Sequence, residues 1–367
     1  MRTSFGPTVG GCQGPCGCTH RALAVTCPAE MVDEAKSPGE AVKVADEEAF
    51  VRLVEPYRRE LRAHCYRMSG SLHDAEDLVQ DAIFRAWEGR ATFEGRSSLR
   101  TWLYKVTTNV CLNALDARRT RTLPMEIGQR VASLDNLSER LADPTWLEPW
   151  PDALCPSPTV SPEARYSERE SVALAFLVAL QLLPPKQRAV LILRDVFGFD
   201  ASECAELLDL TVVAVKSALQ RARETLDSQG RTLGDPIAPV ENEATRRLLA
   251  SYVEAWESAD VPRLVSLLHD DATLAMPPFS EWLRGAHAIV AGFHDKIFAA
   301  KGRGGVRLIA TRANGMPAFA TYSRETSSDP FGARSIQVIG VRGDRIATIT
   351  NFLGSGTVTP FGLSRQL

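Results

Sequence analysis

The spacing of apolar positions changes several times along the chain, and each change marks a boundary. Apolar residues recur every three or four positions within residues 47–119 and again within 168–226, which predicts two blocks of amphipathic helices. From residue 243 helical spacing returns and then gives way to alternation, which predicts strands. We therefore expect two small all-α domains followed by one α+β domain.

The α+β part is expected to begin with helices and to end in strands. The predicted elements are helices over residues 244–258, 261–271 and 285–299, a short strand at 272–276, and strands at 306–313, 317–324, 335–342 and 345–353. Stretches that contain Pro and Gly separate the blocks. The predicted organisation is a disordered segment (1–45), a helical domain (46–120), a linker (121–167), a second helical domain (168–228), a short linker (229–242) and the α+β domain (243–367).

Composition and charge narrow the class of protein. The hydrophobic fraction of 44% and the charged fraction of 24% are ordinary for a soluble globular protein. A net charge of −3 provides no global attraction to nucleic acid, so any site for a polyanion must be a local patch. No apolar run approaches the roughly 20 residues that cross a bilayer, and the N-terminus lacks a signal-peptide pattern. We expect a cytoplasmic protein without membrane contact.

The cysteines are expected to be buried structural residues and not metal ligands. Cys65, Cys111 and Cys204 fall within helical patterns and are expected to be small buried residues. Four more stand near one another beside His20 and could bind zinc, although their spacing fits no common zinc frame: Cys12, Cys16, Cys18 and Cys27. We expect no metal site and no cofactor, and a start of translation at Met31 is one hypothesis for this end.

The stretch "DAEDLVQDAIFRAWEG" (74–89) predicts an amphipathic helix with an acidic polar side. Five acidic residues and one base, Arg85, lie between positions 74 and 88, and Phe84 stands among the acids on the helical wheel. Two interpretations remain open. The acids could form a solvated helix face, or they could form a docking surface for a basic partner helix.

The next helix has the opposite charge. Five bases and one acid lie between residues 100 and 121. Trp102, Lys105 and Asn109 share one face, where an aromatic ring can stack on unpaired bases and a cation can hold phosphates. The preceding polar loop (93–98) could receive an extruded base. The alternative is that Trp102 and Tyr104 are core aromatics.

Three long stretches resemble the two domains of an extracytoplasmic-function (ECF) sigma factor of bacterial RNA polymerase. They are "YRRELRAHCYRMSGSLHDAEDLVQDAIFRAW" (57–87), "GRSSLRTWLYKVTTNVCLNALDARR" (95–119) and "LPPKQRAVLILRDVFGFDASECAELLDLTVVAVKSALQRARETL" (183–226). The resemblance implies partners: the β′ clamp helices and β flap of core polymerase, and promoter DNA. It also implies site residues. Polymerase contacts are expected at Asp74, Asp77, Gln80, Asp81 and Phe84, and contacts to the −10 promoter element at Trp102, Lys105, Asn109, Arg118, Arg119 and Arg121.

The second block is expected to end in a helix-turn-helix for the −35 element. Asp200 can cap the helix "ASECAELL", Asp209 can adopt the left-handed turn conformation, and Thr211 can cap the recognition helix. The resemblance places DNA contacts at Thr211, Val213, Lys216, Ser217, Gln220, Arg221 and Arg223. The alternative is a structural helical hairpin whose Lys and Arg residues are solvated.

The last 125 residues or so resemble a SnoaL-like, NTF2-type cone, an extension found in one group of ECF factors. "NGMP" (314–317) and "WLEPWPD" (146–152) resemble motifs of that group. They predict a regulatory contact that involves Trp146, Trp150, Asn314, Gly315 and Pro317. The alternative for "NGMP" is a simple turn between strands.

Catalysis by the cone is the less favoured interpretation. Its candidate acid–base groups are His269, Asp270, Asp271, His287 and His294, and the sequence groups none of them in a pocket. His269 is expected at a helix end. We expect no catalytic residues and a regulatory cone that replaces a separate anti-sigma factor; ligand sensing by the cone stays open. Two rival hypotheses are a helix-turn-helix regulator that never binds polymerase and a cyclase-like enzyme with a DNA-binding arm.

Overall fold

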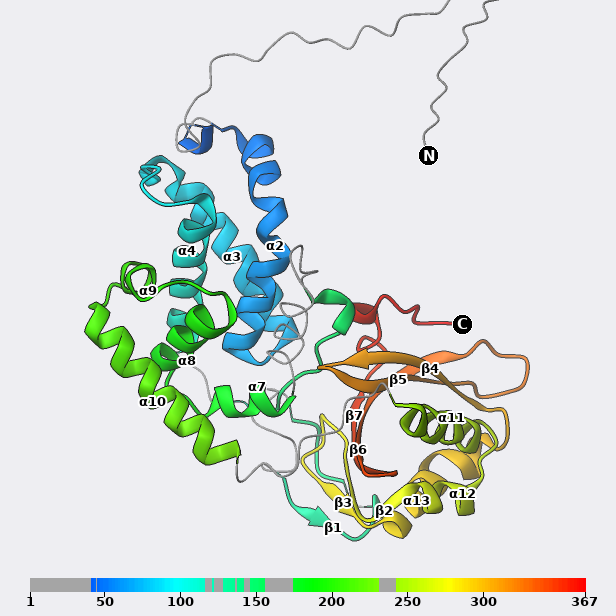
Figure 1. Ribbon diagram of the computed structural model, residues 1–367. Coiled ribbons are helices and arrows are strands. Elements are labelled where there is room, and N and C mark those ends of the chain that lie inside the picture. The colour runs from blue at the N-terminus through cyan, green and yellow to red at the C-terminus, as the bar shows by residue number, and fades with distance from the viewer. Residues whose placement is uncertain are drawn as a thin grey trace, which may run out of the picture.

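The computed structural model describes residues 41–43, 45–115, 121, 128–135, 137–141, 146–155, 174–230 and 242–367. A helical part lies on one side and a curved sheet with its own helices on the other, as Figure 1 shows. The predicted fold class is confirmed: two all-α domains precede one α+β domain. The N-terminal cysteines and His20 lie outside the described residues.

The first helical domain is a bundle of three helices: α2 (Glu47–Ser69), α3 (Leu72–Gly89) and α4 (Leu99–Leu115). Polar caps define the helix starts. Asp46 accepts a hydrogen bond from the Ala49 N–H at 2.8 Å, and Ser71 accepts one from the Asp74 N–H at 3.0 Å. Gly70 ends α2 with φ +73°, and an added Cβ there would lie 2.4 Å from Leu147 Cδ2 of the linker.

The second helical domain contains α7 (Leu174–Gln181), α8 (Pro185–Leu191), the π-helix η3 (Ile192–Val196), α9 (Ala201–Leu208) and α10 (Val212–Gly230). The predicted helix-turn-helix is present. Asp200 forms a capping box with Glu203, Asp209 has φ 51° in the turn, and Thr211 Oγ1 accepts from the Ala214 N–H at 3.1 Å. The short polar side chains at these positions therefore define both ends of the turn.

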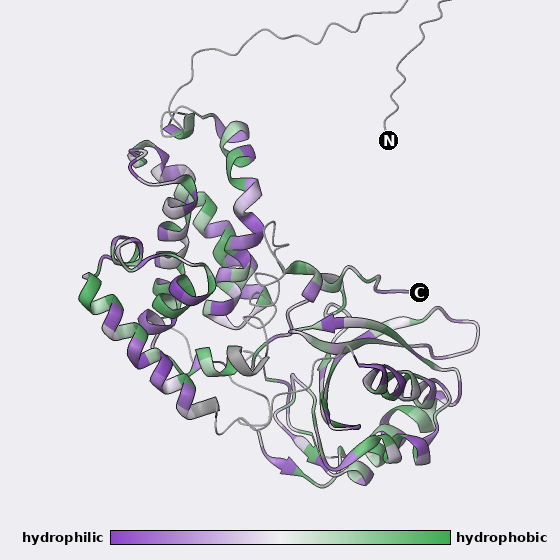
Figure 2. Ribbon diagram, in the orientation of Figure 1, coloured by the Kyte–Doolittle hydropathy of each residue, from purple (hydrophilic) through white to green (hydrophobic). Residues whose placement is uncertain are grey.

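The two helical domains share one continuous hydrophobic core. Arg188 of α8 is buried between them and donates to the Met68 carbonyl and, at 2.7 Å, to Gln181 Oε1. Gln181 in turn donates to the Arg67 carbonyl. Figure 2 shows hydrophobic and hydrophilic residues alternating along the helices, as expected for elements buried on one side. The helical domains thus form one packed unit.

The α+β domain is a sheet of seven strands in the order β1-β3-β2-β7-β6-β5-β4. Its strands are β1 (Arg130–Val131), β2 (Leu268–Ala275), β3 (Trp282–Arg284), β4 (Val306–Ala313), β5 (Met316–Ser323), β6 (Gly332–Arg342) and β7 (Arg345–Leu353). The curved sheet encloses its helices (Figure 1), which are α11 (Glu243–Glu257), α12 (Val261–Leu267), α13 (Ala286–Phe293), η4 (His294–Phe298) and α14 (Ala299–Lys301).

Two sequence predictions need correction here. Residues 268–271 are not helical, because β2 begins at Leu268 and pairs in parallel with β7. The segment predicted as a linker also contributes structure: its residues Arg130 and Val131 form β1, parallel to β3. The same segment contains the 3-10 turn η2 (Asp152–Leu154) and three buried side chains near it, Trp146, Leu147 and Trp150. The linker therefore packs against both neighbouring parts.

Candidate docking and nucleic-acid interfaces

The polar side of α3 is an exposed ridge formed by Asp77, Gln80, Asp81 and Phe84, which we call the α3 ridge. Phe84 is 58% exposed although it is a large apolar residue. The Asp81 carboxylate pairs with Arg85 at 3.0 Å, and Asp77 lies 3.8 Å from His73. The opposite side of α3 is buried in the helical core. The ridge thus combines one exposed aromatic side chain with the carboxylates of Asp77 and Asp81.

Asp74 and Arg121 do not lie on the surfaces predicted for them. They form an ion pair at 2.8 Å, and each side chain is only 9% exposed. Arg121 also donates to the Trp146 carbonyl at 3.4 Å. The helical wheel places Asp74 on the polar side, but the linker covers that end of the helix. The pair instead joins α3 to the linker. The other two predicted arginines, Arg118 and Arg119, lie outside the described residues.

The predicted DNA face of α4 is partly covered. Trp102 is half-buried against Phe93, with ring centroids 5.0 Å apart, and Asn109 is also half-buried. Lys105 Nζ donates to the Glu206 carbonyl at 3.0 Å and to Asp209 Oδ1 at 2.8 Å. The turn of the helix-turn-helix therefore holds the cation predicted to contact DNA.

The alternative interpretation, that Trp102 and Tyr104 are core aromatics, is tested by the aromatic packing behind that face. Tyr104 is fully buried and packs 4.9 Å from the Phe197 ring, so it is a core aromatic. His64 packs against both of these rings and bonds Thr108 Oγ1 at 2.9 Å. Burial, assisted by the Arg67 charge, lowers the pKa of His64 to about 3. The core interpretation therefore holds for Tyr104.

The outer face of α10 is open. The exposed predicted contacts are Thr211, Val213, Lys216, Gln220, Arg221 and Arg223, and Ser217 is half-buried. Val213 is 73% exposed near the start of the helix. Arg223 donates to both Asp195 oxygens, at 3.0 and 2.7 Å, and Gln220 to Glu224 at 2.9 Å. The opposite face of the helix is buried through Val215, Ala218 and Ala222. This arrangement presents the N-terminal half of a recognition helix to solvent.

The "NGMP" motif forms a turn and an interdomain contact at once. Asn314 and Gly315 have φ 54° and φ 74° and connect β4 to β5, where Ala313 pairs with Met316. The Asn314 Oδ1 accepts from the Trp150 N–H at 2.9 Å, and its Nδ2 donates to the Tyr66 hydroxyl at 2.9 Å. One amide thus joins the cone, the linker and α2.

Neighbouring bonds extend this contact. The Asn314 N–H donates to the Trp150 carbonyl at 2.9 Å, and the Gly315 N–H donates to Asp152 Oδ1 at 2.9 Å. Arg312 pairs with the same Asp152 carboxylate at 3.0 Å.

The rings around the contact are buried. Tyr66 donates to the Glu148 carbonyl at 2.7 Å, and burial raises the pKa of this phenol well above its ordinary value. Trp146 packs with Ala313 and Met316 in the outer cluster of the cone, while Pro317 lies in β5 opposite Arg312. The two motifs therefore meet through hydrogen bonds between backbone and side-chain groups and through aromatic packing.

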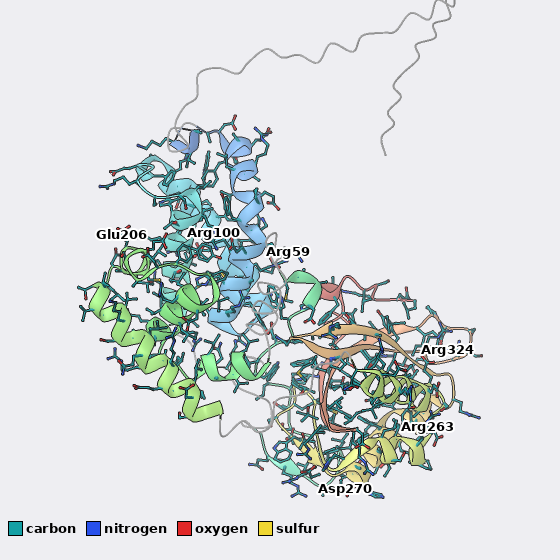
Figure 3. The ribbon with its side chains drawn as sticks, viewed as in Figure 1. Arg59, Arg100, Glu206, Arg263, Asp270 and Arg324 are labelled. Atoms are coloured by element: carbon teal, nitrogen blue, oxygen red, sulfur yellow. The ribbon has the colours of Figure 1, made fainter. Side chains whose placement is uncertain are left out.

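The candidate acid–base groups of the cone are dispersed. His269 lies in β2 and not at a helix end, with Nδ1 2.6 Å from Asp271 Oδ1, and both contact Arg342. Asp270 lies at the outer edge of the cone (Figure 3). His287 and His294 are exposed. The hydrophobic core of the cone contains aliphatic residues and five buried aromatic ones, which are Tyr252, Trp256, Phe293, Phe298 and Phe319. Among the described residues, no group of three His, Cys, Asp or Glu could hold a metal ion.

No helix within the described parts of the chain is long and apolar enough to cross a membrane.

Comparison with known proteins identifies the class. Family models for sigma-70 region 2, sigma-70 region 4 and a SnoaL-like domain match residues 53–121, 173–226 and 249–349. The ECF RNA polymerase sigma factor SigG of Mycobacterium tuberculosis is 43% identical over 318 residues, which cover 87% of this chain and 85% of the relative. SigJ of the same organism is 30% identical over 60% of this chain and 62% of its own.

A solved structure supports the same fold. The crystal structure of M. tuberculosis SigJ matches with a TM-score of 0.51 at 22% identity, covering 86% of this chain and 100% of the other. The chain belongs to the ECF family of RNA polymerase sigma factors. It therefore functions in promoter-directed initiation of transcription, and the hypothesis of a regulator that never binds polymerase is wrong.

Proposed function

We propose that the α3 ridge seats this sigma factor on a basic helical hairpin of core polymerase, the β′ clamp helices. The observation that carries the proposal is Phe84, which is 58% exposed between carboxylates on a helix whose other side is fully packed. An aromatic anchor amid charges suits a charged partner helix, because the ring provides contact area and the acids provide orientation and association rate. The buried Asp74 takes no part in this surface.

Charge reversal at the ridge tests the proposal. The double variant Asp77→Lys, Asp81→Lys is expected to lose co-purification with core polymerase, because two attractive pairs become repulsive. Glu48→Lys, Glu55→Lys is the matched control, since both residues are exposed acids on α2. The docking proposal fails if the ridge variant and the control bind core polymerase equally well.

We further propose that two helices recognise the promoter: α10, whose outer face is exposed, and α4, whose predicted DNA face is partly covered. The open face of α10 suits the −35 element, and Trp102, Lys105 and Asn109 of α4 suit the −10 element, with Arg118 and Arg119 beyond its described end. Lys105 is held by Glu206 and Asp209, so the second helical domain must leave α4 before this cation can meet DNA. We infer that the described arrangement is a closed state of the factor.

The cone is proposed to stabilise this closed state through Asn314. Its amide binds both the linker at Trp150 and α2 at Tyr66, so the cone restrains the segment that joins the two DNA-reading domains. Loosening the contact with Asn314→Gly is expected to raise run-off transcription by core polymerase. A yield equal to that of the wild type at every promoter tested would contradict the regulatory role. That no separate anti-sigma factor acts on the chain stays a prediction.

A further inference from the structure

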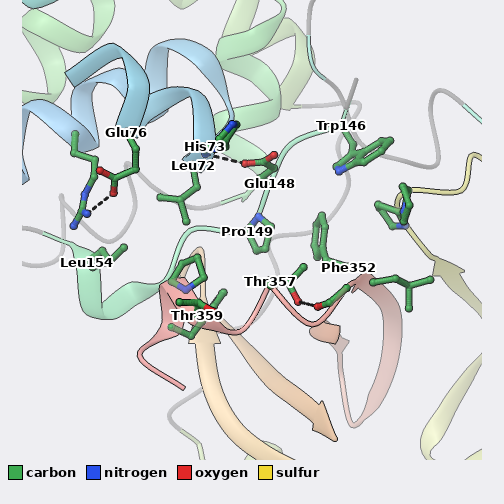
Figure 4. Close-up of a pocket in the computed structure, with 18 residues that line it drawn as sticks. Leu72, His73, Glu76, Trp146, Glu148, Pro149, Leu154, Phe352, Thr357 and Thr359 are labelled. Atoms are coloured by element: carbon green, nitrogen blue, oxygen red, sulfur yellow. Dashed lines mark hydrogen bonds and ion pairs between the residues drawn. The ribbon is translucent and has the colours of Figure 1, made fainter. Parts of the chain in front are cut away.

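A cavity of about 680 Å³ lies where the first helical domain, the linker and the cone meet. Figure 4 shows Leu72 of α3, Glu148 and Trp146 of the linker, and Phe352 of the cone around it. The volume falls within the range that holds a drug-sized ligand, and junctions between domains are common places for such sites. We propose that this cavity binds a small apolar molecule that is uncharged or carries one positive charge.

The walls of the cavity favour apolar contacts. Trp146, Leu72 and Phe352 are each at most 8% exposed and present rings or branched chains to the space. Four prolines also line it and offer no N–H donor: Pro149, Pro277, Pro278 and Pro360. Displacement of water from apolar surface of this kind by a ligand lowers the free energy and so favours binding.

The backbone around the cavity argues against a peptide as the occupant. A peptide strand would need free N–H and C=O groups to pair with. On the cone side five backbone N–H groups already donate to carbonyl groups within the protein: Leu353 to Pro277, Gly354 to Arg334, Thr357 to Gly354, Thr359 to Gly356 and Phe361 to Val358. A small molecule that relies on apolar contact suits these walls better.

The charges of the lining select against anions. Arg62 is paired with Glu76, which leaves Glu148 as the remaining formal charge of the lining. Glu148 Oε2 accepts from Ser71 Oγ at 2.9 Å and from the His73 N–H at 3.1 Å, so its carboxylate is fixed at the cavity. The Asp, Glu, Lys and Arg residues of the lining together carry one net negative charge. An anionic amphiphile would meet repulsion there, whereas a cationic group would face Glu148.

The position of the site links occupancy to the arrangement of the domains. The three parts of the chain that build the walls must be packed together for the cavity to exist, so a ligand bound there stabilises that packing. This regulatory consequence rests on the proposed function of the cone, whereas binding itself does not.

Fluorescent probes of different charge test the site on the full chain. Neutral Nile red is expected to bind saturably and with one probe per chain, and more tightly than the anionic dye ANS. Leu154→Trp in the linker and Thr359→Trp in the cone each introduce an indole into the cavity and should each weaken Nile red binding about tenfold or more. Leu182→Trp is the matched control, because Leu182 is 45% exposed and is not one of the residues that line the cavity. Thermal melts identify a filling variant that is unfolded, and the effect of the remaining folded variant on Nile red binding then tests the site.

Glu148→Gln adds a charge test, since removing the carboxylate should tighten ANS binding about fivefold. The proposal would be overturned if neither filling variant weakened Nile red binding. It would also be overturned if the wild-type protein bound ANS more tightly than Nile red. If the probes behave as expected while Asn314→Gly transcribes like the wild type, the cavity stands and the regulatory role of the cone fails.

Discussion

The contact made by Asn314 allows a quantitative prediction. Replacing Asn314 by Gly removes two hydrogen bonds of 2.9 Å but keeps the left-handed backbone, which has φ 54° at this position. The Trp150 N–H, in a fully buried residue, loses the acceptor that the Asn314 side chain provides. Leaving a buried donor without an acceptor costs about 1–3 kcal/mol, so we expect the contact to weaken by about 2 kcal/mol, or about 30-fold in its opening equilibrium.

Amide hydrogen exchange measures that opening. The Glu148 N–H is a suitable reporter, because it donates to the Gly70 carbonyl at 3.0 Å and does not touch the mutated side chain. Its protection should fall about 30-fold in Asn314→Gly if the linker opens as a unit. Asn242→Gly is the control, since the Asn242 side chain caps α11 by accepting from the Thr245 N–H at 2.7 Å. Unchanged protection at Glu148 would show that the linker does not depend on Asn314, and the reasoning would be refuted.

Three further changes test other parts of the structure. The pKa of His64 is about 3 in the folded protein and about 6.5 in the unfolded chain. The contribution of neutral His64 to the free energy of unfolding is therefore fully present above pH 6.5 and is lost as the pH falls towards 3, by up to about 1.4 kcal/mol per pH unit. His64→Leu should remove this pH dependence from urea unfolding measured between pH 5 and 7. Asp74→Asn should lower the free energy of unfolding by about 3 kcal/mol, because Arg121 stays buried beside a neutral amide; a loss below about 0.5 kcal/mol would show that the pair is solvated. Lys216→Ala should weaken −35 DNA binding and reduce the slope of log affinity against log salt by about one, with core binding unchanged; an unaltered slope would remove Lys216 from the phosphate contacts.

Local patterns were sufficient for the elements that depend on nearby residues. Alternation alone predicts β4 and β7 with their observed bounds, because a period of two is a local property of the sequence. Asp200 and Asp209 likewise define the ends of α9, since capping and left-handed turns are decided within a few residues. The exposed position of Phe84 also follows from the helical wheel.

Contacts between distant segments could not be predicted in this way. Asp74 belongs to the polar side of its helix by periodicity, yet Arg121 arrives from 47 residues further on and buries it. Lys105 is held by residues more than 100 positions away. The strand β1 has only two residues, too few for a recognisable alternation, and it forms because β3 offers a free edge. Such features depend on how the domains pack against one another, and the residue pattern of one segment does not indicate which distant segment will contact it.

The docking of the α3 ridge is tested most directly by site-specific photo-crosslinking in the assembled holoenzyme. A photoreactive phenylalanine analogue replaces Phe84, and the same analogue at Val51, an apolar residue of α2 that is 42% exposed, is the control. We expect a crosslink from position 84 to the β′ clamp helices and none from position 51. A crosslink from position 84 to any other subunit, or to none, would contradict it.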